Sequence, residues 1–474
     1  MGSQSHRTAD EHEAQPVVVT RRQPAKRDSS EAAAPAPGLE ARKAAARLLA
    51  AVIDKKTPLD GLTDGDHGNP AYMALDPRDR ALVRAILATA LRYRNTIEAL
   101  IAARLDRPLP PNAQTLSHIM HAAAAQMLFL DVPDSAAVDL AVEHARSDPR
   151  TARFANLVNA VLREIGRRKE RALSAVLERT TDAPDWFAAM LRQSYGRERA
   201  ETILAMHRAE APTDFTVKRE PERWAEAFGG FVLPNGSVRV PKLEGPVSEL
   251  PGYADGEWWV QDFAASLPAR LIGDTRGKRV LDLCAAPGGK TAQLALGGGK
   301  VTAVEKSRSR LRRLSENLSR LRLEAELVET DIVDFAPDEL FDAVLLDAPC
   351  SSTGTVRRHP DVPWTKSRDD VAKLADLQAR MLAKAATLVK PGGALVFSNC
   401  SLDPSEGEAV VEAFLALHGE FTRAPADAAG LGVPANMVDA HGQLRTTPAD
   451  LPDAEPRRAG CDGFFAAKLH RSGA

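Results

Sequence analysis

Cysteine is scarce in this sequence, and its spacing excludes the usual structural roles. The chain holds four cysteines among 474 residues, at positions 284, 350, 400 and 461, and none forms a C-x-x-C pair. This spacing argues against a disulfide framework and against a structural zinc site. We therefore expect no bound metal and a reduced, cytoplasmic protein.

Long apolar runs are absent as well. No run approaches the ~20 residues that a membrane span needs, and no apolar signal-peptide stretch lies near the first residue. These absences predict a protein without a membrane partner. The hydrophobic content of 44% is still sufficient for sizeable cores, and the length predicts two or three domains.

A net positive charge is also missing, since the formal charge is −2 at pH 7. Basic residues are nevertheless concentrated in two stretches. These hold Arg153, Arg163, Arg167, Arg168, Lys169 and Arg171, and then Arg308, Arg310, Arg312, Arg313, Arg320 and Arg322. Such clusters can neutralise the phosphates of a nucleic acid. A solvated helix face gives the same pattern, so charge alone does not establish RNA binding.

The hydrophobic pattern divides the chain into four parts. Residues 1–38 are polar and rich in Ala and Pro, which predicts a disordered, basic tail. Residues 39–172 carry apolar residues at helical spacing and predict an all-α domain. Residues 173–275 predict a linker helix and a small α+β unit with short strands between Gly and Pro turns. Residues 276–474 alternate apolar strands with helices, which predicts a doubly wound parallel α/β sheet of the Rossmann-like kind.

Cys350 and Cys400 are the most informative residues, because each follows an apolar strand of the predicted sheet. Residues at the carboxyl ends of such strands lie where ligands bind in open α/β sheets. A single Cys often packs as a small hydrophobe instead. Two in equivalent positions favour cysteine chemistry on a bound substrate. For Cys284 and Cys461 we expect packing roles.

A glycine-rich turn at residues 282–290 follows the first predicted strand and indicates a cofactor site. Gly288 and Gly289 allow the backbone to approach a ligand closely, although such a turn alone is weak evidence of binding. Glu305 ends the next strand, 23 residues after Asp282, where an acid can bind ribose hydroxyls. Asp331 follows the third strand. Three acids at one edge favour a cationic nucleoside such as S-adenosylmethionine over NAD or ATP, although such acids can instead cap the following helices.

Several motifs of this chain resemble those of the Sun-type RNA cytosine-5 methyltransferases. They are Asp282–Thr291 (DLCAAPGGKT), Asp347–Gly354 (DAPCSSTG), Arg358–Asp361 (RHPD), Ser398–Leu402 (SNCSL) and Asp462–Phe465 (DGFF), with Gln261–Asp262 and Ala264–Ser266 upstream. The all-α region resembles the antitermination factor NusB. That pairing is typical of bacterial enzymes that act on 16S rRNA. The resemblance covers about residues 40–470 and is most specific over residues 258–408.

The resemblance implies methylation of carbon 5 of a cytosine with S-adenosylmethionine. Carbon 5 is a poor nucleophile, so a thiolate must first add to carbon 6, which splits one hard step into two easier ones. That thiolate needs an electropositive site near neutral pH. In this family the nucleophile maps to Cys400, and Cys350 assists product release. Asp347 would hold the cytosine edge or the cofactor.

The resemblance also assigns the cofactor site. Its residues are Cys284, Ala285, Ala286, Pro287, Gly288, Gly289, Lys290, Glu305, Asp331 and Asp347. Three positions depart from the family pattern. Asn399 stands where Thr is usual, Gly407 replaces the Asn of a Glu-Asn-Glu stretch, and Phe215–Lys218 (FTVK) replaces a Leu-Arg-Val-Asn segment. These departures concern the positioning of the substrate and leave both cysteines in place.

RNA is the partner that the resemblance implies, with 16S rRNA as the first candidate. The target base must leave its stack or lie in a single-stranded loop. The all-α domain and the small α+β unit would then position RNA through its backbone. A tRNA substrate is the alternative for the same core, and an RNA-binding assembly or antitermination factor is the alternative without catalysis. We expect a monomer, because no interface signal is present.

Overall fold

The computed structural model describes residues 36–65, 67–110 and 113–473. The tail predicted for residues 1–38 therefore lies, up to residue 35, outside the described residues. From Gly38 onward the chain forms one compact unit. Among the described residues, no helix combines the length and the apolar character required to cross a bilayer.

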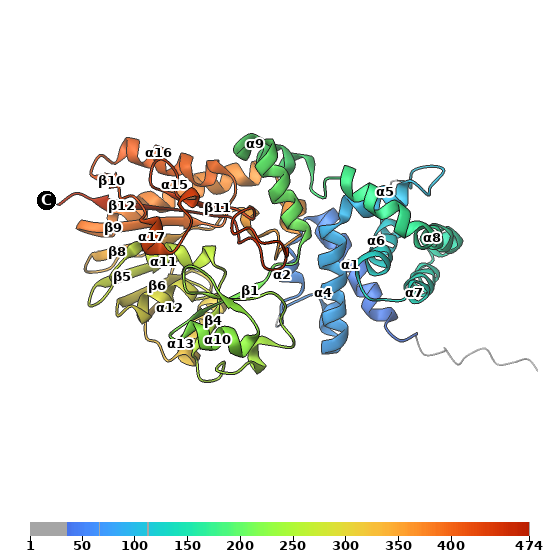
Figure 1. Ribbon diagram of the computed structural model, residues 1–474, viewed down its shortest axis with the longest axis horizontal. Helices are drawn as coiled ribbons and strands as arrows, with labels where there is room; N and C mark the ends of the chain where they lie inside the picture. Colours follow the sequence, from blue (N-terminus) through green and yellow to red (C-terminus); the bar gives the residue numbers. More distant parts are fainter. Residues whose placement is uncertain (1–35, 66, 111–112, 474) are drawn as a thin grey trace, which may run out of the picture. The chain divides into compact units, whose positions relative to one another are not determined.

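The first part of this unit is all-helical, which confirms the predicted all-α domain (Figure 1). Its helices are α1 (Leu39–Lys55), α2 (Leu59–Leu62), α3 (Pro70–Met73), α4 (Pro77–Arg92), α5 (Arg94–Ala102), α6 (Gln114–Phe129), α7 (Asp134–Ser147) and α8 (Ala155–Arg179). Helix α6 buries most of its circumference and contacts α1, α4, α7 and α8. An α-helix that is apolar on all sides belongs at the centre of a bundle, and α6 is that central helix.

A small antiparallel sheet follows helix α9 (Asp185–Arg208). Its strands are β1 (Thr213–Val217), β2 (Phe231–Val232), β3 (Val238–Val240) and β4 (Trp258–Val260), in the order β2-β3-β1-β4, with α10 (Pro221–Phe228) packed on it. Phe215, Trp224 and Trp258 form its buried core. These aromatic side chains therefore stabilise the unit and are not available to stack on bases.

The large sheet occupies the rest of the chain. Its strands are β5 (Arg279–Leu283), β6 (Lys300–Glu305), β7 (Glu326–Glu329), β8 (Phe341–Asp347), β9 (Val389–Asn399), β10 (Phe421–Arg423), β11 (Leu444–Thr446) and β12 (Phe464–Arg471). Their order is β10-β12-β9-β8-β5-β6-β7, with β11 paired to β12. Helix α11 (Leu267–Ile272) precedes these strands, and the helices between them are α12 (Gly289–Leu296), α13 (Arg308–Leu321), α14 (Val362–Thr365), α15 (Arg368–Thr387), α16 (Glu408–Leu417) and α17 (Ala428–Leu431).

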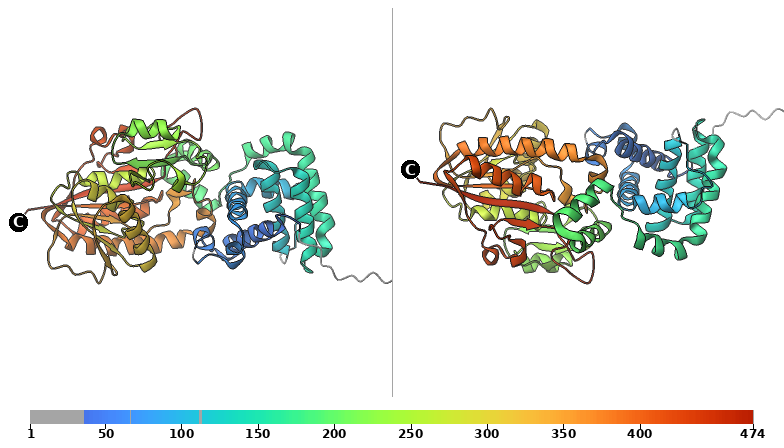
Figure 2. Two further views of the ribbon diagram at one scale, coloured as in Figure 1. Left: turned by 90° about the horizontal axis from the view of Figure 1, so that it is seen from below. Right: turned by 90° about the horizontal axis from the view of Figure 1, so that it is seen from above.

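Both faces of this sheet are covered, as Figure 2 shows from two further directions. Val344 and Leu346 of β8 pack into a core shared with α15 and α16, whereas Ala343 and Leu345 pack into a core shared with α11. Successive residues of a strand point to opposite faces. Two covered faces explain why the central strands are continuous apolar runs.

The sheet is mixed rather than wholly parallel. Strands β5 to β9 pair in parallel, as predicted, but β12 runs antiparallel between β9 and β10. The prediction of a parallel sheet is wrong there, because β12 is reached through the β11 pairing and not through a crossover helix. This pairing places Phe465 opposite Asn399, next to the nucleophile position.

Candidate active site

The topology creates a ligand-binding edge between β5 and β8. The chain moves outward from β5 through β6 and β7 and then returns to pair β8 on the other side of β5. Ligands bind beyond the carboxyl ends of strands at such a switch point. A pocket of about 410 Å³ lies there, lined by Asp282, residues 284–290 and Asp347, with Trp259 and Gln261 on its wall.

The glycine-rich turn is held rigidly against α13. Arg310 donates a hydrogen bond to the Ala286 carbonyl at 2.7 Å, and Asn317 donates one to the Pro287 carbonyl at 2.9 Å. Gly288 has a φ of 102°, and a Cβ there would lie 3.0 Å from Leu314 Cγ. Only glycine adopts this backbone without strain at such close range.

Buried carboxylates of this edge suit a nucleoside with a positive charge. Asp282 accepts a hydrogen bond from Thr291 Oγ1 at 2.6 Å, and its other oxygen, Oδ1, has no partner in the protein. Burial raises the pKa of Asp282 to about 7. An unpartnered buried oxygen calls for a donor or a cation. The free oxygen of Asp282 and the glycine-rich turn therefore fit S-adenosylmethionine.

The other two predicted acids lie away from the pocket wall. Glu305 is buried, accepts from the Ser307 amide at 2.9 Å, and has Arg310 Nη1 3.4 Å from its second oxygen. Asp331 pairs with Lys306 at 2.8 Å, and this pairing lowers its pKa. The structure thus brings residues 284–290 and Asp347 together at the pocket and leaves Glu305 and Asp331 outside its lining.

Asp347 connects the cofactor turn to the cysteine-bearing strands. Its Oδ2 accepts from Lys290 Nζ at 2.8 Å, and its Oδ1 accepts from Ser398 Oγ at 2.9 Å. The Lys290 ammonium also lies 4.9 Å from the centre of the Phe464 ring. A positive charge is therefore fixed between the cofactor turn and the end of β9.

The two cysteines meet because their strands end level with each other. Asp347 pairs with Ser398 in the parallel register, and the loops that follow bring the sulfur atoms of Cys350 and Cys400 to 3.4 Å. The hydrogen bond between the two sulfur atoms lowers the pKa of Cys400. The same contact and burial raise the pKa of Cys350 well above its ordinary value. Of the two thiols, Cys400 is therefore the one that loses its proton more readily.

The remaining cysteines show no sign of reactivity. Burial raises the pKa of Cys284 to about 12, and Cys461 is fully buried with its sulfur 3.5 Å from the Thr447 carbonyl. A reactive cysteine requires an accessible thiolate. Both residues fit the packing roles predicted from the sequence.

Two departures from the family pattern have local structural reasons. Asn399 closes the turn around Cys400, since its Oδ1 accepts from the Ser401 amide at 3.0 Å and its Nδ2 donates to the Glu406 carbonyl at 2.6 Å. At Gly407, a Cβ would lie 2.7 Å from Arg445 Nη2. Arg445, which pairs with Glu408 at 2.5 Å, therefore leaves no room for a side chain at this position.

Sequence analysis missed Glu406 and Gln378 as parts of this site. Both side chains are fully buried beneath the two cysteine loops. The only available signal was the place of Glu406 in the acidic stretch just after Cys400. Gln378 lies in the middle of helix α15, where its sequence gave no indication of a role.

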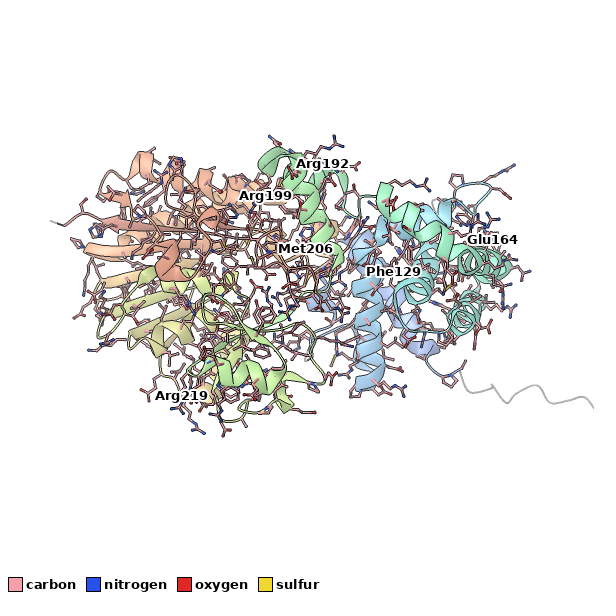
Figure 3. The ribbon with its side chains drawn as sticks, in the orientation of Figure 1. Phe129, Glu164, Arg192, Arg199, Met206 and Arg219 are labelled. Atoms are coloured by element: carbon pink, nitrogen blue, oxygen red, sulfur yellow. The ribbon has the colours of Figure 1, made fainter. Side chains whose placement is uncertain are left out.

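The basic stretch of α8 is substantially neutralised by ion pairs. Arg167 and Arg168 both contact Glu164, labelled in Figure 3, and Lys169 contacts Asp134 at 2.9 Å. These arginines remain largely exposed, with Arg167 at 72% and Arg168 at 66%. The prediction that this surface contacts RNA stays a prediction.

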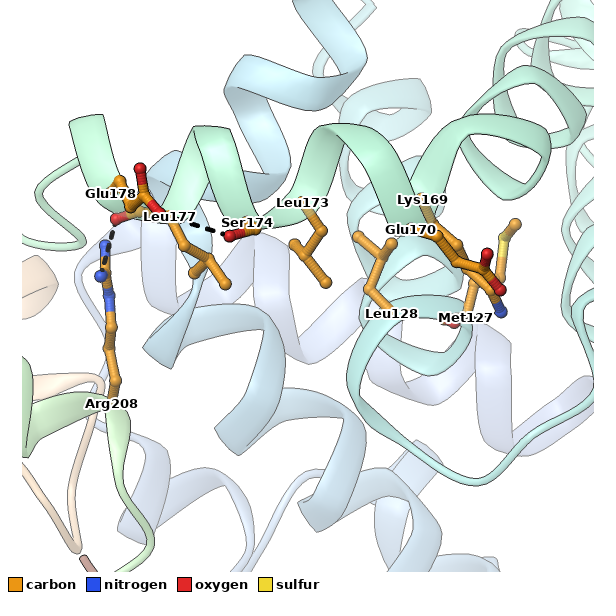
Figure 4. Close-up of a pocket in the computed structure, with 9 residues that line it drawn as sticks. All are labelled: Met127, Leu128, Lys169, Glu170, Leu173, Ser174, Leu177, Glu178 and Arg208. Atoms are coloured by element: carbon orange, nitrogen blue, oxygen red, sulfur yellow. Dashed lines mark hydrogen bonds between the residues drawn. The ribbon is translucent and has the colours of Figure 1, made fainter.

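A second pocket, of about 600 Å³, lies along α8 (Figure 4). Leu128, Leu173 and Leu177 line it together with charged residues such as Lys169 and Glu178. Its one hydroxyl, on Ser174, is engaged with Glu178 at 3.4 Å. No cysteine and no glycine-rich turn line this pocket among the described residues, so the sheet edge remains the candidate active site.

Comparisons with known proteins find similar families for both main parts of the chain. Residues 270–470 match the family described as 16S rRNA methyltransferase RsmB/F, and residues 39–167 match the NusB family. A curated relative, ribosomal RNA small subunit methyltransferase B of Vibrio cholerae, is 34% identical over 80% of this chain and 89% of its own length. The protein of the same name from Xanthomonas campestris is 37% identical over 92% of this chain and 98% of its own length.

A solved structure shares the fold over nearly the whole chain. The crystal structure titled PH0851 has a TM-score of 0.69 and is 23% identical in sequence. The match covers 92% of this chain and 98% of that one. At this level of identity the likeness concerns the fold alone.

Proposed function

The chain belongs to the family of ribosomal RNA small subunit methyltransferase B, and on that premise we propose that it methylates carbon 5 of a cytosine in 16S rRNA through a covalent bond to Cys400. The chain is an RNA methyltransferase, and its cofactor is S-adenosylmethionine. Family membership carries those two statements. The position on the base, the covalent adduct and the roles of individual residues are the proposal.

One observation supports the proposal above all others. The sulfur atoms of Cys350 and Cys400 lie 3.4 Å apart, and the pKa of Cys400 is lowered. Covalent catalysis at pyrimidine carbon 6 requires one such thiolate. The fixed ammonium of Lys290 supplies the electropositive surroundings that stabilise it.

The cofactor would be held by residues 284–290, by the free oxygen of Asp282 and by the carboxylate of Asp347, and when bound it supplies an electrophilic methyl group. A contact between the cofactor and Glu305 or Asp331 stays a prediction from the sequence. Gly288 and Gly289 allow this close approach. Lys290 and Ser398 hold Asp347 in one orientation, because each satisfies one of its carboxylate oxygens. Asp347 therefore presents a fixed acceptor beside the reacting ring.

Cys400 begins the reaction by adding its sulfur to carbon 6 of cytosine. The electron pair of the carbon 5–carbon 6 double bond then makes carbon 5 nucleophilic. After methylation, carbon 5 must lose its proton, and the bond between carbon 6 and the Cys400 sulfur must break. We assign Cys350 to this release step, because its sulfur lies 3.4 Å from that of Cys400. Once Cys400 is bound to carbon 6 it no longer raises the pKa of Cys350, and Cys350 in its thiolate form would take the carbon 5 proton. The electron pair of that carbon–hydrogen bond restores the double bond, and the Cys400 sulfur leaves as a thiolate.

Bisulfite sequencing of total RNA from cells with and without the gene tests the proposal. We expect one cytosine in 16S rRNA to lose its protection when the gene is deleted, and a plasmid-borne copy to restore it. Loss of protection in tRNA instead would overturn 16S rRNA as the substrate and would leave the proposed reaction at carbon 5 of cytosine in place. No change in any RNA would favour a non-catalytic assembly factor, which saturable binding of S-adenosylmethionine would then contradict. An rRNA substrate also implies action in the cytoplasm.

A further inference from the structure

Beneath the two cysteine loops, a single buried carboxylate accepts four hydrogen bonds. Glu406 Oε1 accepts from the Ser351 amide and from Gln378 Nε2, both at 2.9 Å. Its Oε2 accepts from Ser351 Oγ at 2.5 Å and from Ser401 Oγ at 2.6 Å. Ser351 directly follows Cys350, and Ser401 directly follows Cys400. One carboxylate is therefore bonded to both loops.

Further hydrogen bonds complete this buried group of side chains. Thr353 Oγ1 accepts from the Leu402 amide at 2.9 Å, and Ser401 Oγ accepts from the Asp403 amide at 3.0 Å. Gln378 Nε2 also donates to the Pro349 carbonyl at 2.9 Å. Ser351, Thr353, Gln378, Ser401 and Glu406 are each 0% exposed, and we refer to these five residues as the carboxylate cluster.

Donors surround both oxygens of Glu406. The Ser351 amide and Gln378 Nε2 donate to Oε1, and Ser401 Oγ, which itself accepts from the Asp403 amide, donates to Oε2. Burial raises the pKa of Glu406, and the bonds from Ser351, Ser401 and Gln378 oppose that rise. Hydrogen bonds to a charged acceptor are about twice as strong as neutral ones. The carboxylate is thus satisfied in place and cannot reach a substrate.

We propose that Glu406 is a positioning residue that sets the distance between the Cys350 and Cys400 sulfur atoms. The inference rests on the proposed function. Because both loops share one carboxylate, neither can move without breaking a charge-assisted hydrogen bond. A displacement of about 1 Å at a reacting centre costs about 100-fold in rate. Glu406 therefore acts on both the addition by Cys400 and the release by Cys350.

Gln378 belongs to one side of this arrangement only. It joins Glu406 to the Pro349 carbonyl, in the residue before Cys350, and makes no hydrogen bond to Cys400 or Ser401. Its loss should displace the Cys350 loop while Ser401 keeps its bond to Glu406. Gln378→Ala is therefore expected to slow release and to leave addition unchanged.

The test measures addition and release separately in the full-length protein. Addition is measured in the Cys350→Ala enzyme as the rate at which it forms a denaturant-resistant adduct with substrate RNA. The same rate is then measured in Cys350→Ala enzymes that carry a second substitution. Release is the lifetime of the same adduct in enzymes that keep Cys350. The substitutions are E406A, E406Q and Q378A, with E412Q as the control. Glu412 lies on α16, is 55% exposed and contacts Arg423, away from the cluster.

We expect E406A to slow addition about 100-fold, with KM for RNA and for S-adenosylmethionine unchanged. E406Q keeps one acceptor oxygen and should lose about tenfold, since a neutral acceptor replaces a charged one. Q378A should lengthen the lifetime of the adduct and leave the rate of addition to the RNA unchanged. E412Q should match the parent in both measurements.

Normal addition and release in E406A would overturn the positioning role. If E406A does not fold, the ratio of the two rates in Q378A decides, because equal slowing of both steps would also overturn it. A parent enzyme that forms neither adduct nor 5-methylcytosine would overturn the proposed function itself. If the parent enzyme is active and both E406Q and Q378A add and release at the normal rates, the inference about Glu406 is overturned and the proposed function stands.

Discussion

At the residue scale, the two sulfur atoms are close neighbours whose pKa values are shifted in opposite directions. Cys400 is the better nucleophile, because its pKa is lowered while that of Cys350 is raised. We expect Cys400→Ala to reduce methylation to background and to form no adduct. We expect Cys350→Ala to accumulate an adduct that survives denaturing electrophoresis. Cys461→Ala is the matched control, because its buried thiol bonds to the Thr447 carbonyl and not to Cys350 or Cys400, and it should keep turnover. Methylation retained by Cys400→Ala would contradict the assignment of the nucleophile.

The raised pKa of Asp282 predicts how cofactor binding depends on pH. In the free protein this carboxyl is protonated below about pH 7. A cation or donor at its unpartnered oxygen favours the ionised form, so binding releases a proton. Affinity for S-adenosylmethionine should therefore fall as the pH drops below 7, by at most about tenfold per pH unit, and level off above it.

Calorimetric titration between pH 5.5 and 8.5 measures this dependence. The Asp282→Asn variant is the control, because it cannot ionise and shares every titration that belongs to the ligand. The affinity of this variant for S-adenosylmethionine should be lower than that of the parent and should vary less with pH. An identical pH dependence in both proteins would contradict the contact between Asp282 and the cofactor.

At the scale of elements, three segments meet through glycine backbone behind the nucleophile. The Gly354 amide donates to the Cys400 carbonyl at 2.9 Å, and the Gly463 amide donates to the Gly354 carbonyl at 2.8 Å. A Cβ at Gly354 would lie 1.9 Å from the Gly463 carbonyl oxygen. Gly354→Ala should therefore abolish activity and destabilise the fold by about 1–3 kcal/mol or more.

Thermal unfolding and adduct formation check this expectation together. Gly419→Ala is the control, because a Cβ there meets nothing within 4 Å and the backbone is not left-handed. It should leave both measurements unchanged. A Gly354→Ala enzyme with normal adduct formation would show that the three segments can separate without harm to the site.

Part of this architecture could be predicted from the sequence. Apolar spacing identified the helical domain and the parallel strands, and the strand-end rule placed Cys350, Cys400 and the glycine-rich turn at one edge. The antiparallel course of β12 could not be predicted, since an apolar run carries no information about its direction. Nor could the bonding of Glu406 to two loops, because its partners are 55 and 5 positions away along the chain.

At the scale of the whole molecule, buried ion pairs join the small sheet to the large one. Arg358 contacts Asp262 at 2.5 Å and Asp462 at 3.1 Å, and it also donates to the Pro212 carbonyl at 3.1 Å. Asp262 and Asp462 are buried. Removing one partner leaves uncompensated buried charge, so Arg358→Ala should cost about 3–5 kcal/mol of unfolding free energy.

Urea unfolding of the parent and of Arg358→Ala measures that cost. Arg150→Ala is the control, because its ion pair with Asp148 lies on the surface, where Arg150 is 82% exposed, and its midpoint should not move. Equal midpoints for the parent and Arg358→Ala would contradict a structural role for the buried pairs.

The antiparallel strand β12 also sets the order in which the enzyme becomes reactive during its synthesis. Phe465 pairs with Asn399, and Gly463, just before β12, contacts the Gly354 loop, so both supports of the nucleophile follow every other strand of the sheet in the chain. During synthesis from the N-terminus, both cysteines therefore precede the segment that supports them, and their surroundings are complete only when β12 pairs with β9.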